Sequence, residues 1–425
     1  MNRFITNTDQ QQREMLDALG LKKQDELFCD VPVEARIKEP FTLPEALSEY
    51  DLKKVMQNLA GRNISASDAV CFLGAGMYDH FVPSIVNRLT ANIGTVMNGD
   101  GNVAANNGAL QVIHECQKYI SNLCGMENVD LSYASIADAL DVVVGDAVAE
   151  GKKRVVVLRS VNPEYKKALK FICDACGAEL CQAECSDGTT SKDELAKVLD
   201  GDTALVVAQN PNYFGIIEDM TLYSSLAHES GARLAAVVDP ISMAILKTPG
   251  EYYADYALGS GQPLGGTLSF GTPGFAFMAS DARKEVLEGI VTKCDDGYCM
   301  GKKCVCKTNF VSVYAAAVYL AFMGDGIAQV AKTCYSNAYY TYEKLTASSA
   351  FKAVFNKPFF REFAVKATKK NVNDINNRML DYGMIGGPAL KNEYPEYGNA
   401  WLVAVTEKRS ADEVELFVKE ASRSI

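Results

Sequence analysis

A series of short apolar segments that alternate with helical segments places the strongest constraint on this chain. The segments read RVVVL at 154–158, TALVVA at 203–208, ARLAAVVD at 232–239 and ADYALG at 254–259. Each is bounded by Gly, Pro, Asn or Asp, and a helical pattern follows it. Near-continuous apolar strands separated by helices are typical of a mainly parallel sheet that is covered on both faces. The sequence therefore predicts an α/β fold.

The flanking regions have different patterns. The first seventy residues are polar and helical, with Thr8 as a helix N-cap, and prolines break them at positions 32, 40 and 44. We interpret them as an arm that packs on another surface. A long helix from Phe310 to about Thr341 is expected to lead into strands at 362–367 and 400–406. The predicted parts are a helical arm at 1–69, a large α/β domain at 70–309 and a small α+β domain at 310–425.

Charge and hydropathy exclude two classes of partner. The 425 residues include 42 Lys and Arg against 53 Asp and Glu, a net charge of −11, which disfavours binding to nucleic acid. The apolar run Val311–Met323 falls short of the roughly 20 residues that span a bilayer. Residues Met1–Gln10 do not read as a signal peptide. We expect a cytoplasmic protein without a membrane segment, in which most of the 13 cysteines are free thiols.

The loops that follow the predicted strands carry unusual residues. They are Gln209–Gly215, Asp239–Ser242 and the Gly-rich stretch Gly259–Gly266, and ligands collect at the carboxyl ends of parallel strands. An acid at a strand end with a Gly-rich turn about twenty residues later resembles a pyridoxal phosphate enzyme of the aspartate aminotransferase fold (fold type I). That resemblance implies an Asp that pairs with the pyridinium nitrogen and a Lys that forms the Schiff base.

The expected lysine is missing. The chain contains no lysine from Thr248 to Ala282, and Gly261-Gln262-Pro263 stands where one is expected. Lys247 is better interpreted as a solvated loop cation. We therefore expect that this chain holds no cofactor covalently.

Ten short motifs then identify a more specific resemblance. They are FITNTD at 4–9, DELF at 25–28, LPEALSE at 43–49, FLGAGMYDH at 72–80, PNYFG at 211–215, DPIS at 239–242, LKTPGEY at 246–252, GQPLG at 261–265, LSFG at 268–271 and VTEKR at 405–409. In this order they resemble subunit 1 (alpha) of the glycine decarboxylase P-protein, the glycine dehydrogenase of the glycine cleavage system. The resemblance implies a subunit that is not catalytic alone. Its partner would be a beta-type subunit that holds pyridoxal phosphate in an α2β2 tetramer and acts on lipoyl H-protein.

Three segments depart from the family pattern. Residues 95–108 lack a Tyr- and Pro-rich stretch, residues 133–139 lose a glycine, and residues 294–310 replace a longer loop. Because these segments are expected to face an active site, an alternative stays open. The chain could be a divergent paralogue, either a regulatory or binding subunit, with self-association in place of the beta-type partner, or a thiol- or metal-dependent enzyme that uses the Cys294–Cys306 loop.

The residues expected at an active-site wall or an interface come from the retained motifs. They are Tyr78, His80, Pro83, Asn210, Asn212, Asp239 and Gln262. For His80 the alternative is a loop histidine that fixes the turn, and for Asp239 it is a cap beside Pro240. A phosphate-binding role for Gly74-Ala75-Gly76 is disfavoured because the third glycine of a dinucleotide fingerprint is absent. His114 and His228 are expected to pack or to lie at the surface.

Eight cysteines form two groups. Cys294, Cys299, Cys304 and Cys306 lie beside lysines, so a metal site or a disulfide is conceivable. Their spacing matches no standard zinc or iron–sulfur motif, which favours a reduced, flexible loop. The second group is Cys173, Cys176, Cys181 and Cys185, and we expect these to serve as small buried hydrophobes.

Overall fold

The computed structural model describes residues 7–37, 42–65, 68–93, 106–268, 271, 274–295, 297–302 and 307–423, with only the backbone described at 307–309. Contacts divide the chain into two units, residues 1–63 and residues 64–425. The domain limits expected from the sequence, 1–69, 70–309 and 310–425, stay predictions.

The first unit contains two α-helices that bury none of their side chains. Helix α1 (Asp9–Ala18) begins at Thr8, whose hydroxyl accepts from the Gln11 backbone while the Gln11 side chain returns to Thr8 in a capping box. The predicted N-cap is thus confirmed. Helix α2 (Glu49–Ala60) begins at Ser48 in a similar way. The short 3-10 helices η1 (Gln24–Phe28) and η2 (Val33–Ala35) lie between them.

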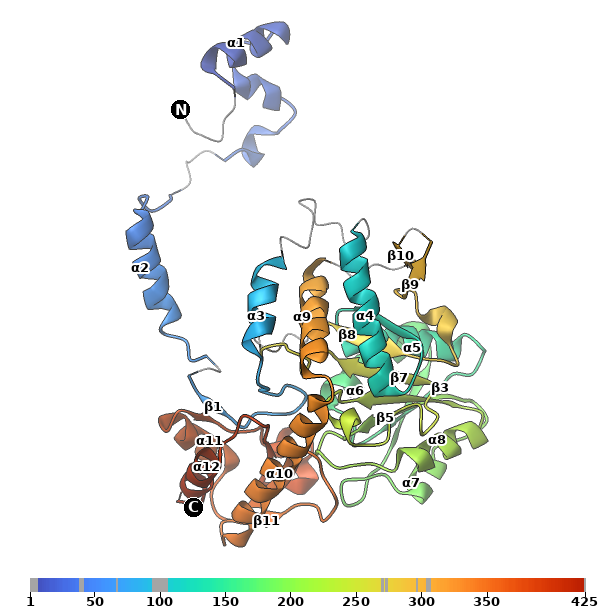
Figure 1. Ribbon diagram of the computed structural model, residues 1–425. Coiled ribbons are helices and arrows are strands. Elements are labelled where there is room, and N and C mark those ends of the chain that lie inside the picture. Colours follow the sequence, from blue (N-terminus) through green and yellow to red (C-terminus); the bar gives the residue numbers. More distant parts are fainter. Residues whose placement is uncertain are drawn as a thin grey trace. The chain divides into compact units, whose positions relative to one another are not determined.

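A seven-stranded sheet organises the second unit (Figure 1), in the order β2-β8-β7-β6-β5-β3-β4. Its strands are β2 (Val129–Tyr133), β3 (Arg154–Leu158), β4 (Glu179–Ala183), β5 (Thr203–Asn210), β6 (Arg233–Val238), β7 (Tyr256–Ser260) and β8 (Ala276–Ala279). Only β8 runs antiparallel to its neighbours. The predicted mainly parallel sheet is therefore present, and its strand limits lie within two residues of the expected ones.

Burial along the strands shows why the apolar runs are continuous. In β5 and β6 nearly every successive residue is buried. Successive side chains of a strand point to opposite faces, so both faces of the sheet must be covered. The covering helices include α4 (Asn107–Cys124), α5 (Ile136–Val148), α6 (Pro163–Cys176), α7 (Lys192–Ala196) and α8 (Met220–Glu229). They contribute to one large apolar core with the sheet.

The predicted long helix is two helices. Helix α9 (Lys307–Met323), which packs beside α4 and α3 (Ser84–Ala91), ends before Gly324, and α10 (Gly326–Ala347) starts in a new direction (Figure 1). Gly324 has a φ of +49°, a left-handed conformation that interrupts a right-handed helix. Within the described residues no single helix is long and apolar enough to cross a membrane. Taken together, α9 and α10 meet those limits, but as a pair bent by 92°.

The C-terminal part forms a small sheet in the order β11-β12-β14. Its strands are β11 (Phe351–Ala353), β12 (Glu362–Ala367) and β14 (Ala400–Ala404). Both longer strands match the expected positions closely. Two helices, α11 (Val372–Asp381) and α12 (Ala411–Arg423), and the pair β1 (Val70–Cys71) with β13 (Met384–Ile385) accompany this sheet. A second apolar core surrounds Phe72, Trp401 and Phe417.

A glycine brings the loop after β5 against the start of β12. Gly215 has a φ of +80°, and a Cβ atom at this position would lie 1.8 Å from the carbonyl oxygen of Glu362. The Phe360 amide also donates to the Gly215 carbonyl at 2.9 Å. This contact therefore depends on the missing side chain.

We predict that Gly215→Ala lowers the free energy of unfolding by about 3 kcal/mol or more, because the new methyl group must displace backbone. Gly145→Ala is the matched control. Gly145 lies inside α5 with no heavy atom within 4 Å of its Cβ position, so this change should stabilise the helix by up to about 1 kcal/mol. Urea unfolding measures both variants, and equal effects would contradict the prediction.

Candidate functional site

A small pocket lies at the carboxyl ends of the parallel strands, where ligands of α/β proteins collect. Its volume is about 50 Å³, which is room for only a few water molecules. Its polar lining comes from Tyr78, Tyr165, Gln209, Asp239, Ser260, Arg361 and Glu362. Of the residues expected from the sequence, Tyr78 and Asp239 therefore line this pocket.

The carboxylate of Asp239 makes two interactions. One oxygen accepts from the amide of Ser242, the first residue of η5 (Ser242–Ala244), at 2.9 Å. The other forms a salt bridge with the guanidinium of Arg361, at the start of β12. Asp239 thus bonds a backbone donor of its own turn and is one half of a largely buried ion pair.

Arg361 fills the centre of the site. Its side chain is 2% exposed, and its Cζ lies 3.5 Å from the centre of the Tyr78 ring. One guanidinium nitrogen lies 2.6 Å from Nε2 of His80. Burial is the largest single influence on the pKa of Arg361 and lowers it, but the charge of Asp239, together with Tyr78, Cys334 and Glu362, raises that pKa above its usual range. The guanidinium is therefore a permanent cation with an aromatic ring against it.

His80 continues the chain of contacts to the C-terminal part. Arginine carries only donors, so Nε2 of His80 accepts from Arg361, and Nδ1 carries the proton that it donates to Glu407 at 2.8 Å. Burial would raise the pKa of Glu407, but the hydrogen bond from His80, the charge that the His80 ring carries when protonated, and the Phe81 amide lower it to about 2. His80 is 5% exposed. The buried His80 ring therefore ties its own turn to Glu407 and also contacts the guanidinium of Arg361.

The ligand atoms of His80, Cys334 and Glu407 lie within 4.8 Å of one another, a spacing that a metal ion could use. The hydrogen bonds argue against a metal here. Both ring nitrogens of His80 are engaged, one of them by a positively charged guanidinium, and Cys334 Sγ donates to Glu407 at 3.2 Å. The cluster is a hydrogen-bonded network.

Glu362 contacts the hydroxyl end of the Tyr78 side chain. Its carboxylate accepts from the Tyr78 hydroxyl at 2.8 Å and from the Ala75 amide at 2.6 Å. Burial is the main cause that raises the pKa of Glu362 to about 7, and the two hydrogen bonds oppose it. Gly74 allows this approach, because a Cβ there would overlap the Glu362 carboxylate. The Gly74–Gly76 turn thus serves backbone packing, as expected.

The remaining expected site residues lie around the pocket and do not point into it. The Asn210 side chain accepts from the Glu218 amide, and Asn212 bonds four partners within and beside its own loop. Gln262 joins the Gly-rich turn to the backbone of Tyr78 at 3.0 Å. Pro83 is the N-cap residue of α3. These four residues hold loops in position.

Pyridoxal phosphate does not fit this pocket. Binding sites for small molecules usually measure about 300–1,000 Å³, far more than the space found here. The carboxylate that would pair with a pyridinium already pairs with Arg361, whose guanidinium covers the Tyr78 ring. Gln262 stands where a Schiff-base lysine is expected. The residues present therefore leave neither the room nor the partner for the cofactor ring.

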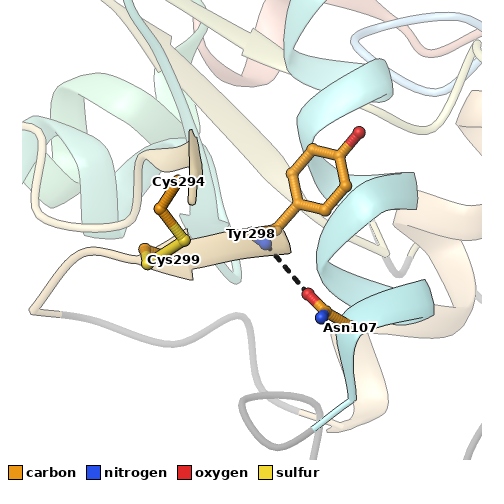
Figure 2. Close-up of a disulfide and its surroundings, with 4 residues drawn as sticks. All are labelled: Asn107, Cys294, Tyr298 and Cys299. Atoms are coloured by element: carbon orange, nitrogen blue, oxygen red, sulfur yellow. Dashed lines mark hydrogen bonds between the residues drawn. A yellow bond between two sulfur atoms is a disulfide. The ribbon is translucent and has the colours of Figure 1, made fainter. Parts of the chain in front are cut away.

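The cysteine loop differs from the expected reduced loop. Cys294 and Cys299 form a disulfide across the hairpin β9 (Val291–Cys294) and β10 (Gly297–Met300), with their Cα atoms 6.0 Å apart (Figure 2). Antiparallel pairing places the two residues near each other, and the Tyr298 amide donates to Asn107 of α4. Oxidised sulfurs are not thiolate ligands, so these two do not support the four-cysteine metal site. Cys304 and Cys306 lie outside the described residues.

The other cysteines and histidines are mostly as expected. Every described cysteine apart from the bonded pair is free. In the second group only Cys173 is buried, while Cys181 and Cys185 are partly exposed and Cys176 is exposed, so the expectation of four buried residues is wrong. Cys176 ends α6 at the surface, which explains its exposure. His114 Nδ1 donates to the Val291 carbonyl, and His228 contacts Asp255.

The two residues that dominate the pocket, Arg361 and Glu362, were not predicted from the sequence. Their signal is a pair of opposite charges inside the apolar run PFFREFAV, at 358–365. Charged residues are rarely buried unless paired, so charges at the start of a buried strand mark a site. Glu407 was present in a quoted motif, but nothing local indicated its partner, His80.

Comparison with known proteins gives consistent matches. The family model described as "Glycine cleavage system P-protein" matches residues 2–291. A protein of Carboxydothermus hydrogenoformans named probable glycine dehydrogenase (decarboxylating) subunit 1 is 35% identical over 443 residues, which are 98% of each chain. A protein of the same name from Moorella thermoacetica is 35% identical over 440 residues, again 98% of each chain.

Solved structures of related fold also match this chain. A glycine decarboxylase (P-protein) of the glycine cleavage system, crystallised in an inhibitor-bound form, superposes with a TM-score of 0.85 at 29% identity and covers 100% of both chains. A sphingosine-1-phosphate lyase from Burkholderia pseudomallei matches with a TM-score of 0.68 at 15% identity, over 93% of this chain and 94% of its own. The predicted fold, that of the type I pyridoxal phosphate-dependent transferases, is confirmed.

The pKa of Glu362 predicts a pH dependence of stability. An unfolded glutamate loses its proton near pH 4.3, whereas the folded chain keeps the Glu362 proton to about pH 7. The folded state therefore binds more protons in this window, and the free energy of unfolding falls as pH rises through it. Between about pH 5 and pH 8 the free energy of unfolding of the wild-type protein falls in part because of Glu362. We predict that Glu362→Gln makes this fall smaller by roughly 2–3 kcal/mol.

Urea unfolding at a series of pH values measures this effect. The matched control is Glu229→Gln, at an exposed glutamate near the end of α8, which should leave the pH slope unchanged. Glu407 does not interfere. Its pKa is lowered to about 2, so its contribution is lost only as pH falls below about 4.3. An unchanged slope in Glu362→Gln would contradict the prediction.

Proposed function

Since this chain belongs to the glycine cleavage system P-protein family, we propose that it is the alpha-type subunit, subunit 1, of a glycine dehydrogenase (decarboxylating). In this proposal a beta-type subunit holds pyridoxal phosphate, and the two chains assemble as α2β2 in the cytoplasm. The partner's cofactor supplies the decarboxylation of glycine, and lipoyl H-protein receives the remaining aminomethyl group. This chain supplies structure and part of the wall of the partner's site.

One observation supports the proposal that the cofactor is held by the other subunit. The chain keeps the family's loops at the strand ends, yet it has no lysine between Thr248 and Ala282, and Arg361 fills the pocket beside Asp239. A chain with this pocket has no means to hold the cofactor itself. The names of its full-length relatives, subunit 1, agree with a role beside a second subunit.

The first unit offers a surface for that second subunit. In α2 the apolar residues Leu52, Val55, Met56 and Leu59 recur at helical spacing, and each is 44–56% exposed. A stripe at positions i, i+3, i+4 and i+7 lies on one helix face and requires a partner surface. We infer that this stripe packs on the beta-type subunit.

Activity of the assembled protein tests the function. The full-length chain and a beta-type homologue from the same genome are purified alone and together, and release of labelled CO₂ from carboxyl-labelled glycine is measured with lipoyl H-protein. We expect activity from the assembly and none from this chain alone. Gly145→Ala serves as a folded control with full activity. Decarboxylation by this chain alone would overturn the proposal.

Variants of α2 test the interface. We predict that Met56→Ser with Leu59→Ser weakens association with the beta-type subunit about 100-fold, because two apolar contacts are lost. The matched control changes two polar residues of the same helix, Gln57→Ser with Asn58→Ser, and should bind normally. Deleting residues 1–44 should give dissociated or aggregated protein. Unchanged assembly of the apolar variant, by sedimentation, would contradict this interface, and unchanged assembly of the truncated chain would show that residues 1–44 take no part in it.

A further inference from the structure

The pocket beside Asp239 contains a planar cation supplied by the chain itself. The guanidinium of Arg361 is flat, its charge is delocalised, and it is fully engaged between the Tyr78 ring, at 3.5 Å, and the Asp239 carboxylate. A protonated aromatic ring bound at this strand end needs the same two partners, a carboxylate and a stacking surface. Arg361 therefore satisfies every requirement that a planar cationic ligand would place on this pocket.

Contacts on the far side hold the guanidinium in this position. His80 Nε2 lies 2.6 Å from one of its nitrogens, and Glu407 fixes the His80 ring through Nδ1 at 2.8 Å. The side chain is 2% exposed. Three side chains hold the guanidinium and water is excluded from it. Rotation of a single side-chain bond therefore cannot move the guanidinium out into solvent.

A capped helix terminus lies beside the pocket. Ile136, the first residue of α5, lines the same pocket, and a helix N-terminus attracts anions such as phosphate. Here Asp138 Oδ2 accepts from the amides of Ala134 and Ser135, each at 3.1 Å, and Ser135 Oγ accepts from the Asp138 amide. These bonds form a capping box, in which the exposed Asp138 carboxylate serves the two amides before the helix and Ser135 serves one helical amide.

We propose that the pocket is a binding site for a planar, delocalised cation and that Arg361 is its built-in occupant. The site is closed by a side chain of the chain itself. This inference goes beyond the proposed function, because it concerns a single chain and holds whatever reaction the assembly performs.

The built-in cation also joins two parts of the fold. Asp239 follows β6 of the large sheet, whereas Arg361 precedes β12 of the small sheet. The ion pair supplies the charge and the contacts between the two sheets that a ligand bound in this pocket would otherwise supply. Removing the guanidinium should therefore leave a hole that a small molecule of the same shape can fill.

Chemical rescue tests the site. The full-length Arg361→Ala protein is melted without additive, with methylguanidinium, and with methylammonium at equal ionic strength. We expect the melting temperature to fall by about 5–10 °C. Methylguanidinium should restore about half of that loss, and methylammonium none, because it has the charge without the planar face. The wild-type protein should respond to neither.

Arg378→Ala is the matched control. Arg378 also lies over a tyrosine, Tyr382, at 5.9 Å and pairs with Glu420, but its side chain is 35% exposed. Methylguanidinium should not rescue this variant. If Arg361→Ala does not fold unaided, the readout is the yield of folded protein after refolding with each additive. Equal effects of the two additives, or equal rescue of both arginine variants, would overturn the proposal.

Pyridoxal phosphate is the second probe. Wild-type protein, Gln262→Lys, and Gln262→Lys with Arg361→Ser are incubated with the cofactor, reduced with borohydride and mapped by mass on peptides of this chain. We expect a pyridoxyl adduct at position 262 only in the double variant, because Arg361 blocks the ring in the other two. Equal labelling of the single and double variants at any level, including none, would overturn the assignment of Arg361. Loss of partner-dependent glycine decarboxylation would not overturn the assignment of Arg361, because that activity tests only the proposed function.

Discussion

The buried ion pair between Asp239 and Arg361 is the interaction on which the rest of the site depends. It joins the end of a strand in the large sheet to the start of a strand in the small one. Removing one partner of such a pair costs about 3–5 kcal/mol, because the other charge stays buried and alone. The Tyr78 ring, His80 and the Glu362 carboxylate are all arranged around this cation. The geometry of the pocket therefore follows from one long-range contact.

That dependence explains which features could be predicted from the sequence. The strands at 154–158 and 362–367 were found at their exact limits, because burial on both faces and turn residues at the ends are local signals. Asp239 was found because its place at a strand end is also local. Its partner lies 122 residues away, and nothing near Asp239 indicates it. The disulfide at Cys294 and the helix break at Gly324 likewise depend on hairpin pairing and on a backbone conformation that composition does not reveal.

The chain keeps the fold of its family around a pocket that its own side chains occupy. The loops at the strand ends retain their motifs, and the overall superposition with a P-protein structure covers the whole chain. The side chains inside the pocket form a closed set of contacts. They are paired with one another, and a carboxylate with its pKa near 7 lies in direct contact with a tyrosine hydroxyl. Fold and motif order are thus better guides to ancestry than to the chemistry of one chain.

The exposed stripe of α2 has a consequence for the supply of this protein in the cell. Within its own unit, α2 leaves Leu52, Val55, Met56 and Leu59 exposed, and in the proposed assembly the partner subunit covers them. Chaperones and proteases act on chains that expose such apolar surface, so an excess copy is subject to clearance. The amount of this subunit that accumulates should then follow the amount of its partner, without any dedicated regulator.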